Sequence, residues 1–289
     1  MNLQSETIIV HQDNLQAEIE MDYFNKRLRV DGFYGSTDVL LNTIQKLTVN
    51  KPFEKLIIYS FQETWMSLLE KGYTPEAVFS KYFSGADNYA MVKYQTIDRR
   101  YTASWLEEDE LLTKVLKKNI RRKDPDKAPV AYTIRKANER DSTELACLYS
   151  QVFSIYPTPM NEPAYVKKKL SEGQVFFVAE KNKKIVSAAS AEVNHTYRNA
   201  ELTDCATIPE ERKHGLMKFL LQELEKELYK QKIICAYSIA RALSFGMNSA
   251  FCQLGYLYRG RLTNNCYIYN SLENMNVWVK DLTVHHSFP

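Results

Sequence analysis

The chain has 289 residues, of which 45% are hydrophobic and 25% are charged, a composition typical of a globular protein with room for two domains. Its 38 basic and 35 acidic residues leave a formal net charge of +3, and this balance argues against nucleic acid as a partner. No apolar run approaches the ~18 residues of a membrane span, and Asp13, Glu18, Glu20 and Asp22 stand where a signal peptide would be apolar, so we expect neither.

The cysteines predict a reduced, metal-free protein of the cytoplasm. They are odd in number, widely spaced and surrounded by apolar residues: Cys147, Cys205, Cys235, Cys252 and Cys266. This spacing fits neither a disulfide framework nor a zinc site. We therefore expect mostly buried free thiols and no bound metal.

The first 120 residues alternate short strands with helices. Hydrophobic patterns predict strands over residues 7–10, 17–21, 26–33, 56–61 and 89–94. Helices are predicted over 37–47 with Ser36 or Thr37 as the cap, from 64 to a stop at Gly72, and from the acidic run 107–110 to Lys117 and Lys118. These elements predict an N-terminal α/β domain over residues 1–120.

A charged stretch with two prolines, residues 121–129, is the predicted linker between this domain and a second one over residues 130–289. Its Arg121-Arg122-Lys123 cluster could contact a phosphate. A solvated connection is the commoner role of such a run, and we interpret the stretch in that way.

The second domain also alternates strands and helices. Strands are predicted over 130–135, 175–180, 185–193, 200–208 and 233–239, near Tyr256 and Tyr267, and over 277–279. Helices are predicted from a capping box of Asp141 and Glu144 to about Phe153, from an Asn161 cap with Pro163 in the first turn, over 216–230, and around 248–254. The short polar turns between residues 175 and 208 favour an antiparallel meander.

Residues 200–221 combine a strand, a short charged loop and the start of an amphipathic helix. A loop that runs directly into a helix presents backbone N–H groups without partners, and the positive end of the helix dipole lies behind them. Gly215 would let a ligand approach this backbone. The stretch therefore predicts a phosphate or pyrophosphate site, and the alternative is an ordinary strand-to-helix connection.

Within this stretch, Arg212-Lys213-His214-Gly215-Leu216-Met217 resembles the [Gln/Arg]-x-x-Gly-x-[Gly/Ala] acetyl-CoA signature of the GNAT N-acetyltransferases. Arg212 and Gly215 match it, whereas Met217 stands where a small residue is usual. The resemblance covers residues 130–289 and implies the GNAT fold, a mixed α/β (α+β) sheet, with acetyl-CoA as co-substrate. It implies cofactor contacts from the signature, the strand before it and a later helix: Arg212, Lys213, His214, Gly215, Leu216, Met217, Cys205, Ala206, Thr207 and Asn248.

The N-terminal domain parallels part of the second domain. A strand, a helix, a buried strand and a Gly-Tyr pair follow one another in residues 29–73 as they do in 202–256, but the first copy lacks the phosphate loop. We interpret residues 1–120 as a degenerate GNAT-like half that no longer binds CoA and serves in packing or dimerisation. The alternative is a coincidence between two α/β patterns.

Acetylation of an amine requires a base, because a lysine-type ammonium titrates near pH ~10. Glu201 and Asp204 are the candidate bases on strand 200–208, where the alternation of side chains directs them to opposite faces. Asp204 could equally bind a substrate ammonium.

The GNAT resemblance also implies an oxyanion donor and an acid. The donor would be a backbone N–H near Cys205–Thr207. The acid is usually a tyrosine of the later helix, but Phe251 occupies its position here. Tyr258, Tyr256 or water must then supply the proton, or the thiolate leaves unassisted.

Glu192 adds a third carboxylate on an adjacent strand, and three such groups favour a cationic substrate. Segments 155–159, 188–192, 200–207 and 240–248 resemble the β-lysine N6-acetyltransferases, which form the compatible solute Nε-acetyl-β-lysine. This resemblance implies contacts to the two ammonium groups and the carboxylate of such a substrate, from Tyr156, Glu192, Asp204 and Arg241. Packing or an ordinary ion pair is the alternative for each of them.

The sequence thus predicts an acetyl-CoA-dependent N-acetyltransferase that acts on the terminal amine of a small diamino acid, most simply β-lysine. Three alternatives stay open. One is a GNAT enzyme for another amine, such as a polyamine or aminoglycoside. Another is a CoA-binding regulatory protein without turnover, which Met217 and Phe251 would suit, and the third is an interaction module that forms a homodimer through residues 1–120.

Overall fold

The structure is a computed structural model, and it describes residues 5–118, 130–269 and 271–284, so the predicted linker lies outside the described residues. The N-terminal half contains β1 (Ser5–Gln12), β2 (Leu15–Asp22), β3 (Arg27–Gly35), α1 (Thr37–Thr48), β4 (Lys55–Ser60), α2 (Trp65–Glu70), β5 (Thr74–Phe83), β6 (Ala86–Tyr94), α3 (Ile97–Arg100) and α4 (Trp105–Lys118).

The C-terminal half carries the remaining elements in a strand–helix alternation. They are β7 (Thr133–Lys136), the 3-10 helix η1 (Glu139–Asp141), α5 (Ser142–Val152), α6 (Pro163–Ser171), β8 (Val175–Lys181), β9 (Lys184–Asn194), β10 (Asn199–Thr207), the 3-10 helix η2 (Pro209–Glu211), α7 (Leu216–Lys230), β11 (Cys235–Arg241), α8 (Phe245–Gln253), β12 (Leu257–Ile268) and β13 (Ser271–Asp281).

All the strands belong to one mixed sheet, and its two halves have the same internal order. In the described residues the sheet has 13 strands in the order β1-β2-β3-β4-β6-β5-β12-β13-β11-β10-β9-β8-β7. The first half therefore runs β1-β2-β3-β4-β6-β5, and the second, read inward from β8, runs β8-β9-β10-β11-β13-β12. In each, an antiparallel meander leads through a helix, α1 or α7, to a parallel neighbour.

The positions of the bulges repeat as well. The β2–β3 register shifts between Glu18 and Ile19 and leaves Asp31 as the extra residue, and the β9–β10 register shifts around Asp204. The strand–helix–strand–helix order that the hypothesis of a degenerate GNAT-like half requires is present in residues 27–70. A common origin of the two halves stays a prediction.

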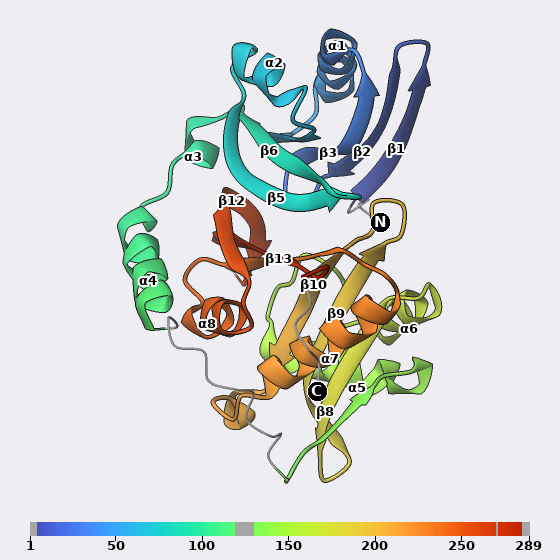
Figure 1. Ribbon diagram of the computed structural model, residues 1–289, viewed down its shortest axis with the longest axis vertical. Helices are drawn as coiled ribbons and strands as arrows, with labels where there is room; N and C mark the ends of the chain where they lie inside the picture. Colours follow the sequence, from blue (N-terminus) through green and yellow to red (C-terminus); the bar gives the residue numbers. More distant parts are fainter. Residues whose placement is uncertain (1–4, 119–129, 270, 285–289) are drawn as a thin grey trace.

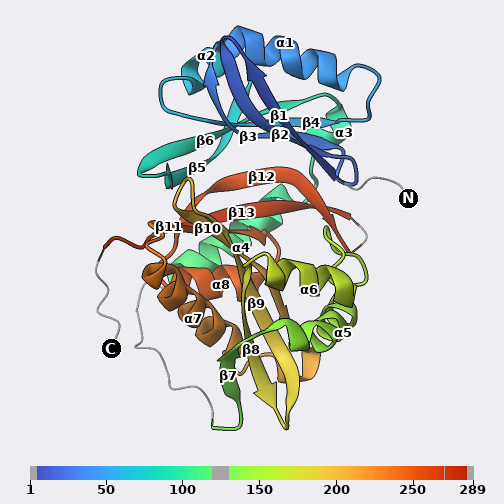
Figure 2. The ribbon, with the colours of Figure 1, turned by 90° about the vertical axis from the view of Figure 1, so that its right-hand side faces the viewer.

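The halves are joined in the sheet where β5 meets β12. Gly260 pairs there with Ala77, and a Cβ on Gly260, whose φ is +135°, would lie 2.2 Å from the backbone oxygen of Glu76. Only glycine allows this approach. From this joint the halves stack on one another with β12 and β13 between them (Figures 1 and 2).

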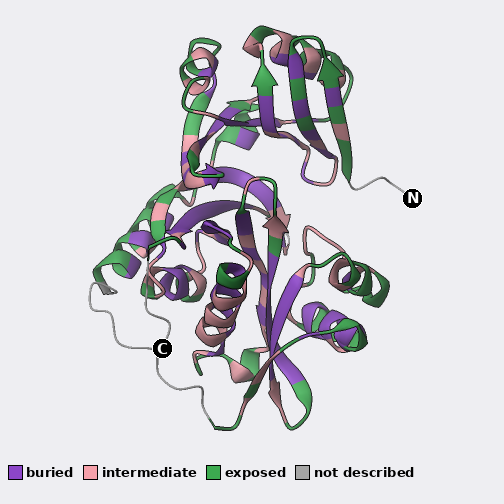
Figure 3. Cartoon of the chain, turned by 45° about the vertical axis from the view of Figure 1, so that its right-hand side comes forward, coloured by how far each residue is buried: buried purple, intermediate pink, exposed green. Residues whose placement is uncertain are grey.

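Alternation along the strands places a core on each side of the sheet. In β4, Leu56 and Ile58 pack under α1, whereas Ile57 and Tyr59 face the other half. β11 does the same, since Ala236 packs under α7 and Tyr237 joins the core between the halves. In Figure 3 the strands of the C-terminal half are largely buried, while the helices expose their outer surfaces.

The last helix before the linker belongs structurally to the C-terminal half. α4 packs on α8, and its Leu112 and Val115 lie in the core beneath α7. The predicted domain boundary at residues 121–129 thus follows α4 in the sequence, although α4 already packs in the core of the C-terminal half.

Some predicted elements and caps are corrected. The capping box lies one turn earlier than predicted, between Asn138 and Asp141, because the Glu144 carboxylate instead accepts from the Ile185 backbone N–H at 2.7 Å. Asn161 does not cap α6, which begins at Pro163 after Glu162. The patterns near residues 256 and 267 belong to one strand, β12, and β5 was missed because its Pro75 is atypical of a strand and stands beside a bulge.

Candidate active site

β10 and β11 are neighbours that separate along their length. They pair in parallel only from Asn199 to Glu201. Beyond that point the two strands diverge, and residues 202–205 and 238–241 line a cavity of about 1110 Å³ between them. The separation leaves a wedge in which backbone N–H groups can meet a ligand.

A bulge in β10 directs the side chain of Asp204 into this cavity. Asp204 has a φ of +50°, in the left-handed region, and the hydroxyl of Tyr149 donates to its backbone oxygen at 2.7 Å. Because of this bulge, Glu201 and Asp204 both line the same cavity, although simple alternation would direct them apart.

The predicted phosphate loop lies at one end of the cavity. Gly215 has a φ of +73° and stands immediately before α7, and Lys213, with a φ of +69°, has the same left-handed conformation. Among the described residues, the backbone N–H groups of 213–217 have no hydrogen-bond partner. Unpaired amides at the start of a 15-residue helix suit an anion.

Five of the six residues of the signature, 212–217, line the cavity, and one does not. The cavity is lined by Arg212, Lys213, Gly215, Leu216 and Met217. His214 turns away instead: its Nδ1 lies 3.2 Å from the Glu211 backbone oxygen, and its ring lies beside Tyr132. A Cβ at Gly215 would meet only ordinary contacts, so the glycine is needed for its positive φ.

Two carboxylates stand side by side in the lining of the cavity. Glu201 of β10 is the direct cross-strand partner of Glu192 of β9, and both line the cavity. Burial, reinforced by Glu192, raises the pKa of Glu201 from 4.5 to about 8, while Arg29 opposes the rise. Glu201 can therefore exchange a proton near neutral pH.

Asp204 is held by three donors. It accepts from the Ser190 hydroxyl at 2.6 Å, the Gln174 amide at 3.0 Å and the Tyr156 hydroxyl at 3.1 Å. Burial, followed by Glu192, raises its pKa to about 6, and the bonds from Ser190 and Tyr156 act in the opposite direction. Asp204 thus anchors the loop between α5 and α6 on which Tyr156 lies.

The two predicted substrate contacts of opposite charge are both paired. Glu192 accepts from Lys169 at 3.3 Å. Arg241 is paired with Glu273 at 3.0 Å, and its guanidinium lies 4.8 Å from the centre of the Tyr269 ring. Both Glu192 and Arg241 line the cavity, as does Tyr156.

Asn248, a predicted cofactor contact, lies outside the cavity lining. Asn248 is fully buried, and its amide donates to the backbone oxygens of Arg241 and Ser244 while its oxygen accepts from Asn276 and Trp278. It therefore fixes the end of β11 to the start of α8 and does not face a cofactor.

Tyr258 does not lie at the cavity either, because it projects from β12 towards Trp278 in the core. Ala206 is buried in the core beneath α5, so that only its neighbours Cys205 and Thr207 line the cavity. Phe251 is fully buried. Neither Tyr258 nor Phe251 can therefore donate a proton in the cavity. Tyr156 and Ser249 are two residues of the cavity lining that carry a hydroxyl group.

Sequence reasoning missed the residues that the N-terminal half adds. Arg27, Arg29 and Tyr59 line the same cavity as Glu201. The signal was present in the predicted strand 26–33, where charged residues alternate with Leu28 and Val30. Such alternation indicates that the charged face meets something other than the N-terminal core.

Two features of the part of the chain that the structure describes concern metal ions and membranes. No group of three or more His, Cys, Asp or Glu side chains is arranged to hold a metal ion there. None of the described helices combines the length and apolar character needed to cross a membrane.

Known proteins resemble this chain along most of its length. The acetyltransferase (GNAT) family matches residues 142–245. The N-acetyltransferase YodP of Bacillus subtilis is 39% identical over 94% of this chain and 98% of its own. Two proteins named beta-lysine N(6)-acetyltransferase are similar: that of Methanosarcina mazei is 35% identical over 86% of this chain and 99% of its own, and that of Methanococcus maripaludis is 31% identical over 95% and 98%.

Proposed function

The chain belongs to the GNAT family and is an N-acetyltransferase, and we propose that it acetylates the terminal amine of a small diamino acid, most simply β-lysine. The names of two relatives support this acceptor. The observation that carries it is the pair of adjacent carboxylates, Glu201 and Glu192, in a cavity that also contains arginines. Such a cavity suits a molecule with an ammonium group at one end and a carboxylate at the other.

GNAT acetyltransferases use acetyl-CoA, which supplies the thioester, and the residues of this chain fit it. The unpaired amides of 213–217 would hold its diphosphate, with Arg212, Lys213 and Lys218 in the same wall of the cavity. The wedge between β10 and β11 leads from this loop to Glu201. Cys205 and Thr207, the other proposed contacts, line the same cavity.

Glu201 is the proposed base. A carboxylate with a pKa of about 8 is a better match to an ammonium that titrates near ~10 than an ordinary glutamate is. Glu201 would take the proton directly or through one water, while Glu192 and Asp204 keep the local charge negative and hold the ammonium. Backbone N–H groups of β10, freed by its divergence from β11, would stabilise the oxygen that gains negative charge.

The product of this reaction suits accumulation in the cell. β-Lysine carries two ammonium groups and one carboxylate, and acetylation of one amine leaves a molecule of zero net charge. We propose that the product serves as a compatible solute. A salt-dependent rise in Nε-acetyl-β-lysine that disappears when the gene is deleted would support this role, and unchanged levels would refute it.

The test of the acceptor is the release of CoA thiol from acetyl-CoA with β-lysine, lysine, ornithine and spermidine. We expect β-lysine to have the highest kcat/KM, with mass spectrometry placing the acetyl group on the terminal nitrogen. A preference for spermidine would mean that the acceptor is a polyamine and not a diamino acid. Binding of acetyl-CoA without thiol release in the presence of any of these amines would refute the proposal.

A further inference from the structure

β3 of the N-terminal half presents two different faces. Leu28 and Val30 are fully buried in the core beneath α1. The alternate residues Arg27 and Arg29 line the cavity that contains Glu201. The N-terminal half therefore supplies two cations to the cavity whose lining also contains Glu192, Glu201 and Asp204 of the other half.

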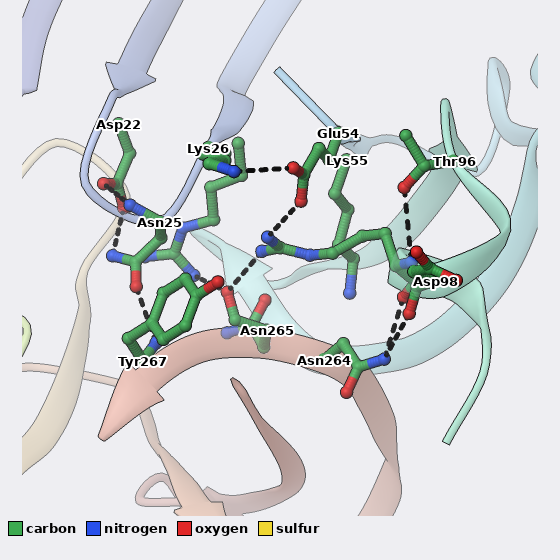
Figure 4. A network of polar contacts seen from close by, with 12 residues as sticks. Asp22, Asn25, Lys26, Glu54, Lys55, Thr96, Asp98, Asn264, Asn265 and Tyr267 are labelled. Carbon is green, nitrogen blue, oxygen red and sulfur yellow. Dashed lines mark hydrogen bonds and ion pairs between the residues drawn. The ribbon is translucent and has the colours of Figure 1, made fainter. Parts of the chain in front are cut away.

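Arg27 is engaged in joining the two halves. Its Nε donates to Asp22 at 2.9 Å, and its Nη1 donates to the backbone oxygen of Asn265 at 3.2 Å. Close by, the side-chain oxygen of Asn25 accepts from the Tyr267 backbone N–H at 2.7 Å. Figure 4 shows this network between the β2–β3 turn and β12. Arg27 thus links the β2–β3 turn to β12 and has a structural role.

Arg29 is held in a different way. Asp31 binds it with both carboxylate oxygens, one to Nε and the other to Nη2 at 2.9 Å, and the Tyr59 ring centre lies 5.7 Å from its guanidinium carbon. These contacts fix the plane of the guanidinium. Within the described residues its Nη1 has no hydrogen-bond partner, and 29% of the side chain remains accessible. Arg29 is therefore a preoriented donor with a free edge.

Arg29 and Glu201 lie within electrostatic reach of each other without touching. No ion pair joins them in the described part of the chain, where Arg29 pairs with Asp31. Among the groups that act on Glu201, Arg29 is the largest of those that hold its pKa down. The space between them suits a ligand whose ammonium meets Glu201 and whose carboxylate meets the guanidinium.

We propose, building on the proposed function, that Arg29 binds the carboxylate of the acceptor and that the N-terminal half thereby selects amino acids over amines without a carboxylate. Arg241 is the rival cation. Its Nη2 is paired with Glu273, and its guanidinium carbon lies 4.8 Å from the Tyr269 ring centre. What separates the two arginines is that Arg241, unlike Arg29, is not among the groups that influence the Glu201 carboxyl most strongly. Asp31 is a positioning residue for Arg29.

The test compares β-lysine with its amide, in which an uncharged carboxamide replaces the carboxylate and both amines are kept. For the wild-type protein, we expect kcat/KM to be on the order of 10- to 100-fold higher for β-lysine, as for the loss of one charge-assisted hydrogen-bond pair. Arg29→Gln should lose most of this preference through a higher KM for β-lysine, with a much smaller effect on the amide. Arg29→Lys, which keeps the charge without the fork, should lie between them.

The preference is a ratio measured on one preparation, so a partly unfolded variant does not distort it. Arg100→Gln, at an exposed arginine of α3 outside the cavity lining, is the matched control and should keep the wild-type ratio. The proposal is overturned if Arg29→Gln keeps the ratio, or if Arg241→Gln abolishes it in place of Arg29→Gln. Equal turnover of both compounds by the wild-type protein refutes this inference alone, whereas turnover of neither refutes the proposed function as well.

Discussion

Replacement of Glu201 by glutamine should separate catalysis from stability, because the same burial that prepares the carboxylate as a base also destabilises the fold. As the base, Glu201 must be ionised, so the rate should rise with pH through its pKa of about 8. Glu201→Gln cannot accept the proton. We expect kcat to fall by a factor on the order of 10² to 10⁴, and the inflection near pH 8 to disappear.

The same substitution should raise the free energy of unfolding. On folding, the pKa of the Glu201 carboxyl rises from 4.5 to about 8. It therefore has no effect on the free energy of unfolding below pH 4.5, lowers that free energy increasingly between pH 4.5 and 8, and lowers it by a constant amount above pH 8. At ~1.4 kcal/mol per pKa unit, the interval up to pH 7 amounts to about 3 kcal/mol. Water in the cavity screens part of it, so Glu201→Gln should gain about 1–3 kcal/mol at pH 7.

Two assays check this prediction. Thiol release between pH 6 and 10 gives the rate profile, and urea unfolding at pH 4.5, 7 and 9 gives the free energies, with the gain absent at the lowest pH. Glu210→Gln, at an exposed glutamate outside the cavity lining, should change neither. A variant that keeps the inflection near pH 8, or that is less stable than the wild type at pH 9, would refute the reasoning.

The other predictions concern residues around the same cavity. Asp204→Asn loses acceptor capacity towards Ser190, Gln174 and Tyr156, so the KM for the amine should rise about tenfold with a smaller change in kcat; a kcat effect as large as that of Glu201→Gln would make Asp204 the base. Gly215→Ala should cost about 1–2 kcal/mol through its φ of +73° and raise the KM for acetyl-CoA. Gly72→Ala, with a φ of +83° and outside the cavity lining, should lose comparable stability in urea with an unchanged KM, and equal KM values for the two variants would contradict the phosphate site. Asn248→Ala should lower the free energy of unfolding by about 2–4 kcal/mol, because the buried donors of Asn276 and Trp278 lose their acceptor. An increased KM for acetyl-CoA without this loss of stability would instead indicate that Asn248 contacts the cofactor.

The local pattern of the chain was sufficient for the meander, the glycine-containing loop before residue 216 and the helix after it. Strand 200–208 and helix 216–230 are present within a residue of their predicted bounds. Their signals are short-range, since alternation, helical spacing and a glycine before a helix start all lie within about 20 residues of sequence. The family signature could be found for the same reason.

Side-chain direction was harder to predict where the backbone is irregular. Alternation placed Glu201 and Asp204 on opposite faces, but the bulge brings both into one cavity. Asn248 was expected to face the cofactor, yet Trp278 and Asn276, from a strand much later in the chain, bind its side chain in the core. Neither outcome can be derived from the residues adjacent in sequence.

By itself, the sequence determined most of the helices and strands of this protein, although not β5, and the glycine-containing loop before α7. Only the tertiary structure decided that Arg29 of β3 and Glu201 of β10, 172 positions apart in the sequence, line one cavity. The physical reason is that helices and strands depend on hydrogen bonds and burial patterns along short segments. Contact between the halves depends on how the sheet closes at Gly260 and Ala77 and on the apolar core that both halves share.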